Sequence, residues 1–185
     1  MVEPFLQSMD ARMKKAVGAL REELSGIRTG RASTSLLEHI LVEAYGTPTP
    51  LNQLAAINVP EARLITVQPW DKSTTKAIEK AIMESDLGLN PMNDGEMIRV
   101  PLPELTEERR KELVKVLHKL GEQGKVAMRN IRRDSMDQAK KMEKGKKISL
   151  DELRQLEKKI QDRTDHFIKD VDGAVAQKEA DIMQV

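Results

Sequence analysis

The sequence predicts an α+β protein: a long three-helix bundle, discontinuous in the chain, with a small inserted β/α/β domain. Apolar residues recur at helical spacing along three highly charged segments, one near the N-terminus and two in the second half. Strand-like alternation is confined to the stretch between the first and second of these segments. The 185 residues include only two Phe, one Tyr and one Trp. A thin core of aliphatic side chains, as in a narrow bundle, is therefore expected.

The first predicted helix covers residues 4–27. Its apolar positions are separated by steps of three and four residues, which gives one narrow stripe. Pro4 suits the first helical turn, where its missing N–H is not needed. The stripe consists of Leu6, Met9, Met13, Ala16, Val17, Leu20, Leu24 and Ile27.

The second predicted helix covers residues 106–147, and some 40 helical residues would span about 60 Å. Thr106 is the expected N-cap, and Gly145 is available to end the helix within a basic run. Gly121 and Gly124 each disfavour a helix interior by about 1 kcal/mol relative to Ala. Close helix packing is the preferred explanation of both glycines, and close approach by a partner is the alternative. The stripe consists of Leu113, Leu117, Leu120, Gly124, Ala127, Met128, Ile131, Ser135, Ala139 and Met142.

The third predicted helix starts at Ser149, where Ser149 and Glu152 form a capping box. The short connection at 146–148 makes the second and third helices antiparallel neighbours. Two such stripes bury each other poorly, so the first helix supplies the third face of a bundle. A long dimeric coiled coil is the rival architecture. The stripe consists of Leu153, Leu156, Ile160, Thr164, Phe167, Val171, Ala174, Val175, Lys178 and Ile182.

Residues 30–105 are predicted to form the inserted domain, and residues 1–29 with 106–185 the bundle. Alternation at 39–45 places Ile40, Val42 and Ala44 on one face of a strand. Prolines at 48 and 50 favour a loop at 46–50. Further strands are expected at 54–59, 63–68 and 97–100, a helix at 73–84, and a loop-rich stretch at 86–95.

Two linkers, 28–33 and 101–105, join the predicted domains and favour a hinge with a limited arc. Gly30 supplies backbone freedom, whereas Pro101 and Pro103 restrict it. A rigid elbow is the alternative. The expected hinge residues are Thr29, Gly30, Arg31, Pro101, Pro103 and Leu105.

Composition excludes several classes of site. The absence of cysteine rules out disulfides and thiolate metal sites. No phosphate-binding loop, dinucleotide motif, zinc-protease motif or nucleophile elbow is present, and His39, His118 and His166 are scattered. We therefore expect no catalytic site, no metal and no cofactor. The N-terminus lacks a signal peptide and no apolar run could span a membrane, so a cytoplasmic protein is expected.

One basic cluster stands out: Lys125, Arg129, Arg132 and Arg133 fall along one side of the second predicted helix. Residues 106–147 carry 14 basic and 7 acidic side chains, net +7, although the whole chain is only +1. The planar fork of arginine suits phosphate, so this side is a candidate surface for structured RNA. Arg28 and Arg31, at the predicted hinge, could extend it. The alternative is a solvated basic face whose partners are Asp134 and Asp137.

Seven collinear motifs, spread over most of the chain, resemble the bacterial ribosome recycling factor family. Two small departures are Thr34, where proline is common, and Ser135-Met136, where Ala-Asn is common. The motifs are IRTGRAS at 27–33, YGTPTPL at 45–51, AIEKAI at 77–82, DLGLNP at 86–91, RVPLP at 99–103, LTEERR at 105–110 and RNIRRD at 129–134.

The resemblance implies an L-shaped, hinged, non-enzymatic protein that binds the post-termination ribosome. With elongation factor G and its GTP hydrolysis, the family splits the subunits and releases mRNA and tRNA. Family arginines that bind large-subunit rRNA correspond to Arg129, Arg132 and Arg133, and the hinge arginines correspond to Arg28 and Arg31.

The small domain would face the translocase, through a loop at Tyr45, Gly46, Thr47 and Pro48. We expect a monomer whose partners are large-subunit rRNA and elongation factor G, with no membrane partner. A coiled-coil adaptor or chaperone is the alternative function, and an enzyme is a second alternative that would require a pocket.

Overall fold

The computed structural model describes residues 1–184, which divide into two compact units. The helical unit consists of Met1–Leu24 and Val114–Glu179, and the β unit consists of Ser25–Leu113 with residues 180–184. The chain thus passes between the units three times, and most of the β unit is an insertion between the two stretches of the helical unit. The predicted domain boundaries, after residues 29 and 105, stay predictions.

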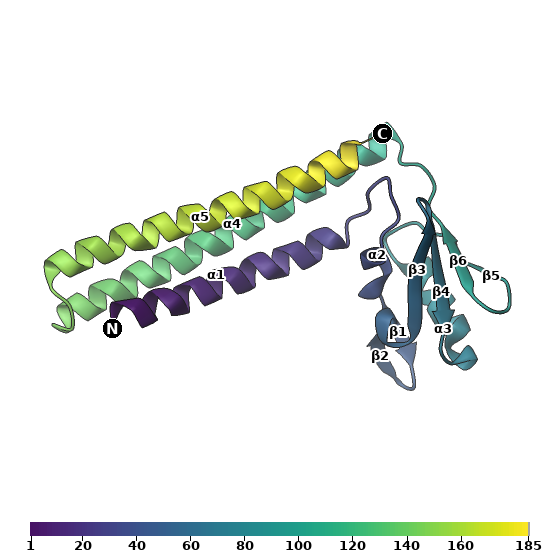
Figure 1. The fold of residues 1–185 in the computed structure, drawn as a ribbon, viewed down its shortest axis with the longest axis horizontal. Coiled ribbons are helices and arrows are strands. Elements are labelled where there is room, and N and C mark those ends of the chain that lie inside the picture. Colours follow the sequence, from purple (N-terminus) through teal and green to yellow (C-terminus); the bar gives the residue numbers. More distant parts are fainter. Residues whose placement is uncertain (185) are drawn as a thin grey trace. The chain divides into compact units, whose positions relative to one another are not determined.

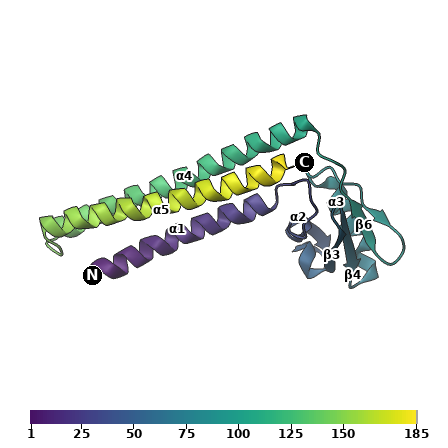
Figure 2. The same cartoon turned by 45° about the horizontal axis from the view of Figure 1, so that its top comes forward.

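The helical unit is built from three long helices that run side by side in both views (Figures 1 and 2). They are α1 (Val2–Ser25), α4 (Glu107–Lys144) and α5 (Leu150–Met183). The ion pair between Arg12 and Asp134 joins α1 to α4 at 3.1 Å, and that between Lys125 and Asp172 joins α4 to α5 at 2.6 Å. From Gly124 to Asp134 of α4, the contacts with α1 move back from Leu20 to Arg12. From Lys125 to Arg132, the contacts with α5 move back from Asp172 to Gln161, so α4 is antiparallel to both neighbours.

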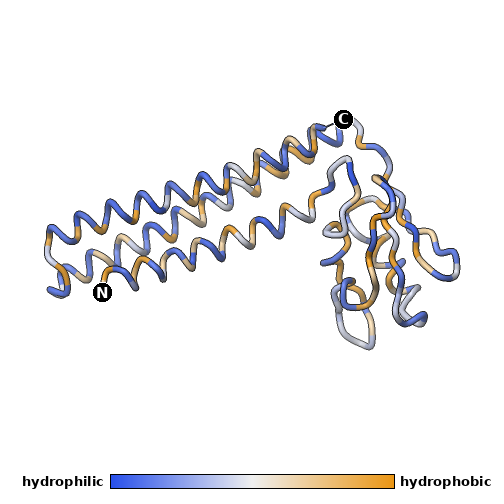
Figure 3. Tube along the Cα trace, viewed as in Figure 1, coloured by the Kyte–Doolittle hydropathy of each residue, from blue (hydrophilic) through white to orange (hydrophobic). Residues whose placement is uncertain are grey.

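The predicted apolar stripes form the core of this bundle. Apolar and polar residues alternate along every helix in Figure 3, as expected when one stripe is buried and the rest is solvated. The three-helix bundle and its thin aliphatic core are confirmed. The buried side chains include Leu6, Met9, Met13, Val17, Leu20 and Leu24 of α1, Leu117, Met128, Ile131 and Ala139 of α4, and Leu153, Leu156, Ile160, Phe167 and Val171 of α5.

Both predicted helix starts are confirmed by their hydrogen bonds. At α4, the backbone N–H of Arg109 donates to Thr106 Oγ1 at 3.1 Å. At α5, Ser149 N–H donates to Glu152 Oε2 at 2.7 Å, and Glu152 N–H donates to Ser149 Oγ at 3.1 Å. These bonds satisfy amides that a helix start leaves unpaired. The bond from the Ser149 N–H to the Glu152 carboxylate is the main cause of a pKa of Glu152 below its ordinary value, because it favours the ionised form.

The last residue of α4 is Lys144, directly before Gly145. Lys146, not Gly145, adopts the left-handed conformation, with φ 57°. Lys147 N–H donates to Met142 O at 2.9 Å and Lys146 N–H donates to Glu143 O at 2.8 Å, which is a Schellman pattern. Glycine usually occupies the left-handed position of this motif. The helix therefore ends directly before Gly145, as the sequence indicated, and the left-handed residue follows one position later.

Gly121 and Gly124 mark the closest packing of α4. A Cβ atom added at Gly121 would lie 2.8 Å from Val175 Cγ2, a side chain of α5. One added at Gly124 would lie 3.0 Å from Leu20 Cδ2 of α1 and 3.5 Å from Val171 Cγ1 of α5. Close helix packing, the preferred explanation of both glycines, is confirmed.

The β unit contains an antiparallel four-stranded sheet of order β3-β4-β6-β5 and a separate two-stranded hairpin, β1-β2. A bulge lies between Asn58 and Glu61 of β3. The strands are β1 (Leu41–Ala44), β2 (Thr47–Pro50), β3 (Ala55–Glu61), β4 (Leu64–Pro69), β5 (Met92–Asn93) and β6 (Ile98–Pro101). The helical segments are α2 (Ser35–Glu38), α3 (Thr75–Glu84), and the 3-10 turns η1 (Leu51–Gln53) and η2 (Lys72–Thr74).

The predicted loop at 46–50 is wrong, because Thr47–Pro50 forms β2 and pairs with β1. Ala44 pairs with Thr47 across a two-residue turn. Antiparallel pairs alternate between hydrogen-bonded and non-hydrogen-bonded, so the next pair, Glu43 with Pro48, needs no proline N–H. The same holds for Leu41 with Pro50. Proline is compatible with these outward positions of an edge strand.

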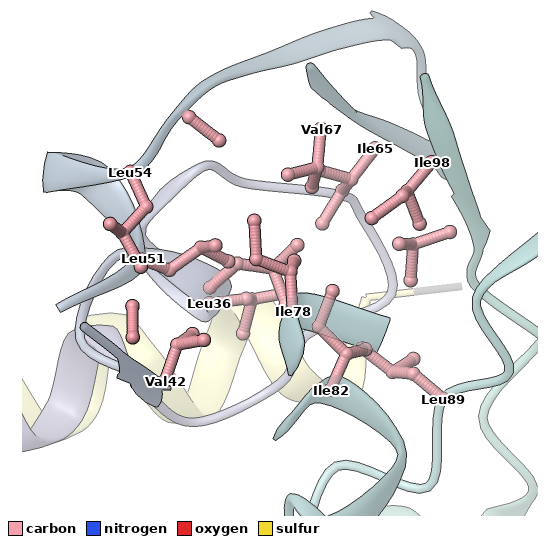
Figure 4. Packing of buried hydrophobic residues seen from close by; sticks show 14 of the residues in the cluster. Leu36, Val42, Leu51, Leu54, Ile65, Val67, Ile78, Ile82, Leu89 and Ile98 are labelled. Carbon is pink, nitrogen blue, oxygen red and sulfur yellow. The ribbon is translucent and has the colours of Figure 1, made fainter. Parts of the chain in front are cut away.

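One apolar cluster joins the hairpin, the larger sheet and α3 (Figure 4). Ile78 and Ile82 of α3 are fully buried with Ile65 of β4 and Ile98 of β6, and Val42 of β1 is buried in the same cluster. The predicted helix on a sheet is thus confirmed. The short elements α2 and β5 were not predicted.

We predict that Gly121→Ala destabilises the protein by about 1 kcal/mol, because overpacking a stiff valine outweighs the better helix propensity of alanine. Gly173→Ala is the matched control, since a Cβ there meets nothing within 4 Å. That variant should gain up to about 1 kcal/mol. Urea unfolding followed by circular dichroism measures both. Equal stability of the two variants would contradict the packing explanation.

Candidate nucleic-acid interface

Four cations of α4 form what we term the cationic ridge: Lys125, Arg129, Arg132 and Arg133. At 3.6 residues per turn they span about 100° of the helix circumference. Met128 and Ile131, within the same stretch, are buried in the bundle and fix the helix beneath the ridge. The ridge therefore lies on a rigid element rather than on a loop.

Two ridge cations lie on the flank of α4 that faces α5. Lys125 Nζ is 2.6 Å from Asp172 Oδ1, and Arg132 donates from Nη1 to Gln161 Oε1 at 2.9 Å. Gln161 in turn donates from Nε2 to Asp165 Oδ1 at 2.8 Å. These contacts orient both cations. Arg132 Nε is buried and has no hydrogen-bond partner within residues 1–184.

The other two ridge cations are more exposed. Arg129 Nη2 is 2.6 Å from Glu122 Oε1, two turns earlier on α4. Arg133 donates to Asn130 Oδ1 at 3.5 Å, which is at the long limit for a hydrogen bond. Guanidinium groups on such a surface can form two parallel hydrogen bonds with one phosphate.

The acidic partners of the ridge differ from those that the sequence indicated. Asp134 pairs with Arg12 of α1 at 3.1 Å, so it holds two helices together. The carboxylates on the ridge are Glu122 and Asp172 instead. The latter could not be found from local spacing, because it comes from another helix.

Arg28 and Arg31 belong to the β unit, whereas the ridge belongs to the helical unit. The Arg28 guanidinium donates from Nη2 to the carbonyl oxygen of Pro103, and its Nε finds no hydrogen-bond partner in the described part of the chain. Burial, with repulsion from Arg109 as the smaller cause, lowers the pKa of Arg28 below its ordinary value. The Arg31 side chain is exposed.

The expected hinge residues lie in two stretches that hydrogen bonds tie to the β unit. Ala32 N–H donates to Ala62 O at 2.7 Å, and Leu102 N–H donates to Arg63 O at 2.8 Å. Thr29 Oγ1 accepts from the N–H of Arg31 at 3.3 Å. Both linkers thus meet the β3–β4 turn. Gly30, Pro101, Pro103 and Leu105 flank these contacts, and their role in a hinge stays a prediction.

The predicted translocase-facing loop is the turn of the β1-β2 hairpin. Tyr45 and Gly46 have φ of 53° and 79°, the two positive angles of a type I′ turn, and Thr47 and Pro48 begin β2. Tyr45 is exposed, and its hydroxyl donates to Asp71 Oδ2 at 2.5 Å. That hydrogen bond raises the pKa of Tyr45 and lowers the pKa of Asp71.

Sequence reasoning missed Trp70 beside this turn. Its side chain is 68% exposed, and Asp71, the partner of Tyr45, is the next residue. The only tryptophan and the only tyrosine of the chain therefore lie near each other on the surface. Exposed aromatic side chains of this kind often anchor protein interfaces. The available signal was the rarity of aromatic residues.

The histidines do not form a cluster, and two of them contact single carboxylates. His118 Nε2 is 3.0 Å from Glu179 Oε2, and His166 Nε2 is 3.8 Å from Asp170 Oδ2. Over residues 1–184, no three His, Asp or Glu side chains gather in a way that could hold a metal ion. Over the same residues, no helix combines the length and apolar character needed to cross a membrane.

Comparison with known proteins identifies the family of the chain. A family model described as ribosome recycling factor matches residues 20–183. The ribosome-recycling factor of Rhodospirillum centenum is 56% identical over 185 residues, which is 100% of both chains. That of Brucella ovis is 55% identical over 180 residues, or 97% of each chain.

Solved structures agree over the full length. A solution structure of the ribosome recycling factor is 44% identical, has a TM-score of 0.77, and covers 100% of this chain and 98% of its own. A second chain comes from models for the T. thermophilus ribosome recycling factor and the E. coli elongation factor G bound to the E. coli post-termination complex. It is 44% identical, with a TM-score of 0.69 and 100% coverage of both chains. Since sequence and fold both match end to end, this protein belongs to the ribosome recycling factor family.

Proposed function

We propose that this protein recycles the ribosome after termination, as a non-enzymatic partner of elongation factor G. It binds the post-termination ribosome and, with GTP hydrolysis by the translocase, promotes separation of the subunits and release of mRNA and tRNA. Family membership supports this proposal, as does the related structure bound to a post-termination complex with elongation factor G. The protein acts as a monomer, without a cofactor, and in the cytoplasm, where ribosomes translate.

The observation that carries the proposal is the cationic ridge. Arg129 and Arg133 are exposed on the surface of α4, and Arg132 is held by Gln161 with its fork only partly buried. Phosphates of large-subunit rRNA supply the matching anions, and displaced counterions add to the affinity. Few aromatic side chains are available to stack on bases, which favours structured RNA over single strands.

The mechanical step falls to the β unit. Residues 30–104 carry net charge −4, so they are poorly suited to bind RNA phosphates themselves. The ridge anchors the protein, and movement of the β unit about the linkers disrupts contacts between subunits. Arg28 and Arg31 contact rRNA near the pivot. The force comes from the translocase, which faces the turn at Tyr45, Gly46, Thr47 and Pro48.

Arg132→Ala should weaken binding to large subunits by about 1–3 kcal/mol, the usual loss for a charge-assisted contact. Replacing Arg129, Arg132 and Arg133 together by Ala should abolish detectable docking. Co-sedimentation with purified large subunits across a salt series measures both effects. Lys158→Ala, an exposed lysine of α5 outside the ridge, is the control for loss of one positive charge. Unchanged docking of the triple variant would disprove the RNA-binding role of the ridge.

Gly30→Pro should leave docking intact and slow subunit splitting at least tenfold, because proline fixes φ in one linker. Gly30→Ala is the matched control: its Cβ would lie 3.6 Å from Gln184 O, an ordinary contact, and alanine leaves the backbone mobile. Light scattering with elongation factor G and GTP follows splitting. A normal rate of splitting by Gly30→Pro would show that the protein does not pivot at this linker.

Tyr45→Ala and Trp70→Ala should each reduce translocase-dependent splitting about tenfold, as truncation of an aromatic anchor does at a protein interface. Binding to large subunits alone should stay unchanged, because the ridge is untouched. Tyr45→Phe keeps the aromatic ring but removes the hydroxyl that bonds to Asp71, so it distinguishes the contributions of the two. Met83→Ala, at an exposed apolar side chain of α3, serves as the control. If all four variants split subunits at the rate of the unmodified protein, this turn is not part of the translocase contact.

A further inference from the structure

Two of the four ridge cations are already paired with carboxylates. The distances are short for exposed pairs: 2.6 Å for Lys125 with Asp172 and 2.6 Å for Arg129 with Glu122. The carboxylate side chains are 54% and 61% exposed, respectively. Water and ions therefore reach both pairs, and such pairs exchange partners at little cost.

The other two ridge cations have neutral partners. Arg132 donates to the amide oxygen of Gln161 at 2.9 Å, and Arg133 to that of Asn130 at 3.5 Å. Their positive charge is uncompensated by these contacts. Arg132 and Arg133 thus keep their full charge, whereas carboxylates neutralise Lys125 and Arg129. The net positive charge of the ridge that an approaching polyanion meets is therefore lower than four cations would give.

An RNA phosphate at Lys125 or Arg129 has to replace a carboxylate that uses the same N–H donors. Glu122 reaches Arg129 along α4, whereas Asp172 reaches Lys125 from α5, so the two carboxylates flank the ridge from different helices. Non-specific binding depends almost wholly on the net charge that phosphates meet. An RNA surface with a phosphate opposite each of the four cations forms direct contacts with all of them. These contacts offset the loss of both ion pairs within the protein.

We propose that Glu122 and Asp172 determine the selectivity of the cationic ridge, by competing with phosphate and suppressing its binding to RNA of arbitrary shape. This inference rests on the proposed function, because it takes the ridge as the RNA-binding surface. It assigns the two carboxylates a role in recognition rather than in stability of the bundle. The ligand class remains RNA phosphate, and the new element is its intramolecular competitor.

The test compares Glu122→Gln, Asp172→Asn and the double variant with the unmodified protein. The probes are a 20-base-pair RNA duplex of arbitrary sequence and purified large ribosomal subunits. The double variant should bind the duplex about 3- to 10-fold more tightly, and its plot of log affinity against log salt should be steeper by about two, one for each cation set free. Binding to large subunits should change less than 3-fold, so selectivity falls.

Asp151→Asn is the matched control, since it removes one exposed carboxylate from the same unit, where it lies 4.0 Å from Arg154 and not on the ridge. Its duplex affinity should stay within 2-fold of the unmodified protein. Equal tightening by Asp151→Asn would overturn the proposal, because net charge alone would explain the effect. Unchanged or weaker duplex binding by the double variant would also overturn it, and weaker binding would mean that the carboxylates orient the cations.

Failure of this inference is distinguishable from failure of the proposed function. If the triple arginine variant loses docking to large subunits while the double carboxylate variant behaves as the unmodified protein, only the competition is wrong. If the triple arginine variant docks normally, the ridge is not the RNA-binding surface, so the RNA-binding role proposed for the ridge and the competition both fail. Circular dichroism melting of every variant verifies that the bundle is intact.

Discussion

The close packing of α4 at Gly121 and Gly124 holds the three-helix bundle together and fixes the cationic ridge on it. At Gly124 the missing side chain leaves room for Leu20 of α1 and Val171 of α5 together, so three helices meet at one level. The cationic ridge begins at the next residue, Lys125. Because the same stretch of backbone closes the bundle and carries the ridge, the positions of the cations are fixed by apolar packing beneath them. Any loosening of that contact would change both.

The packing of the three helices also decides which charged side chains of the helical unit can pair. Ion pairs such as Arg12 with Asp134 and Arg163 with Asp10 connect neighbouring helices, at 3.1 Å and 2.5 Å. The ridge cations repel one another, and within residues 1–184 two of them, Lys125 and Arg129, have carboxylate partners. A basic surface without enough intramolecular anions is less stable by itself than a balanced one. An anionic partner, such as the RNA that we propose, would offset this excess charge.

Much of the fold could be predicted from the sequence because helix periodicity and capping are local. The stripes, the caps at Thr106 and Ser149, and the face of α3 with Ile78 and Ile82 follow from residues close in the chain. Strand β2 was missed because proline, which has no N–H to donate, was treated as unsuitable at every strand position. Whether a given position needs that N–H depends on the pairing register, which the sequence does not show. The two-residue strand at Met92–Asn93 is too short for alternation to be visible.

Less of the candidate site could be predicted. The sequence placed the four cations on one side of a helix, but their partners depend on the register between α4 and α5. Asp172 and Gln161 reach the ridge only once that register is known. Trp70 was missed for another reason: a single exposed aromatic residue leaves no periodic pattern, and its meaning depends on Tyr45 and Asp71 beside it.

The two linkers constrain how the proposed movement can occur. Ala32 and Leu102 donate to Ala62 and Arg63, adjacent residues of the β3–β4 turn, so both strands of the connection are fixed to one point of the β unit. Arg28 adds a direct bond between the linkers through the Pro103 carbonyl. Movement that separated the two strands would break these bonds, whereas bending of both strands together would preserve them. In the movement that we propose, the two linkers would therefore move together.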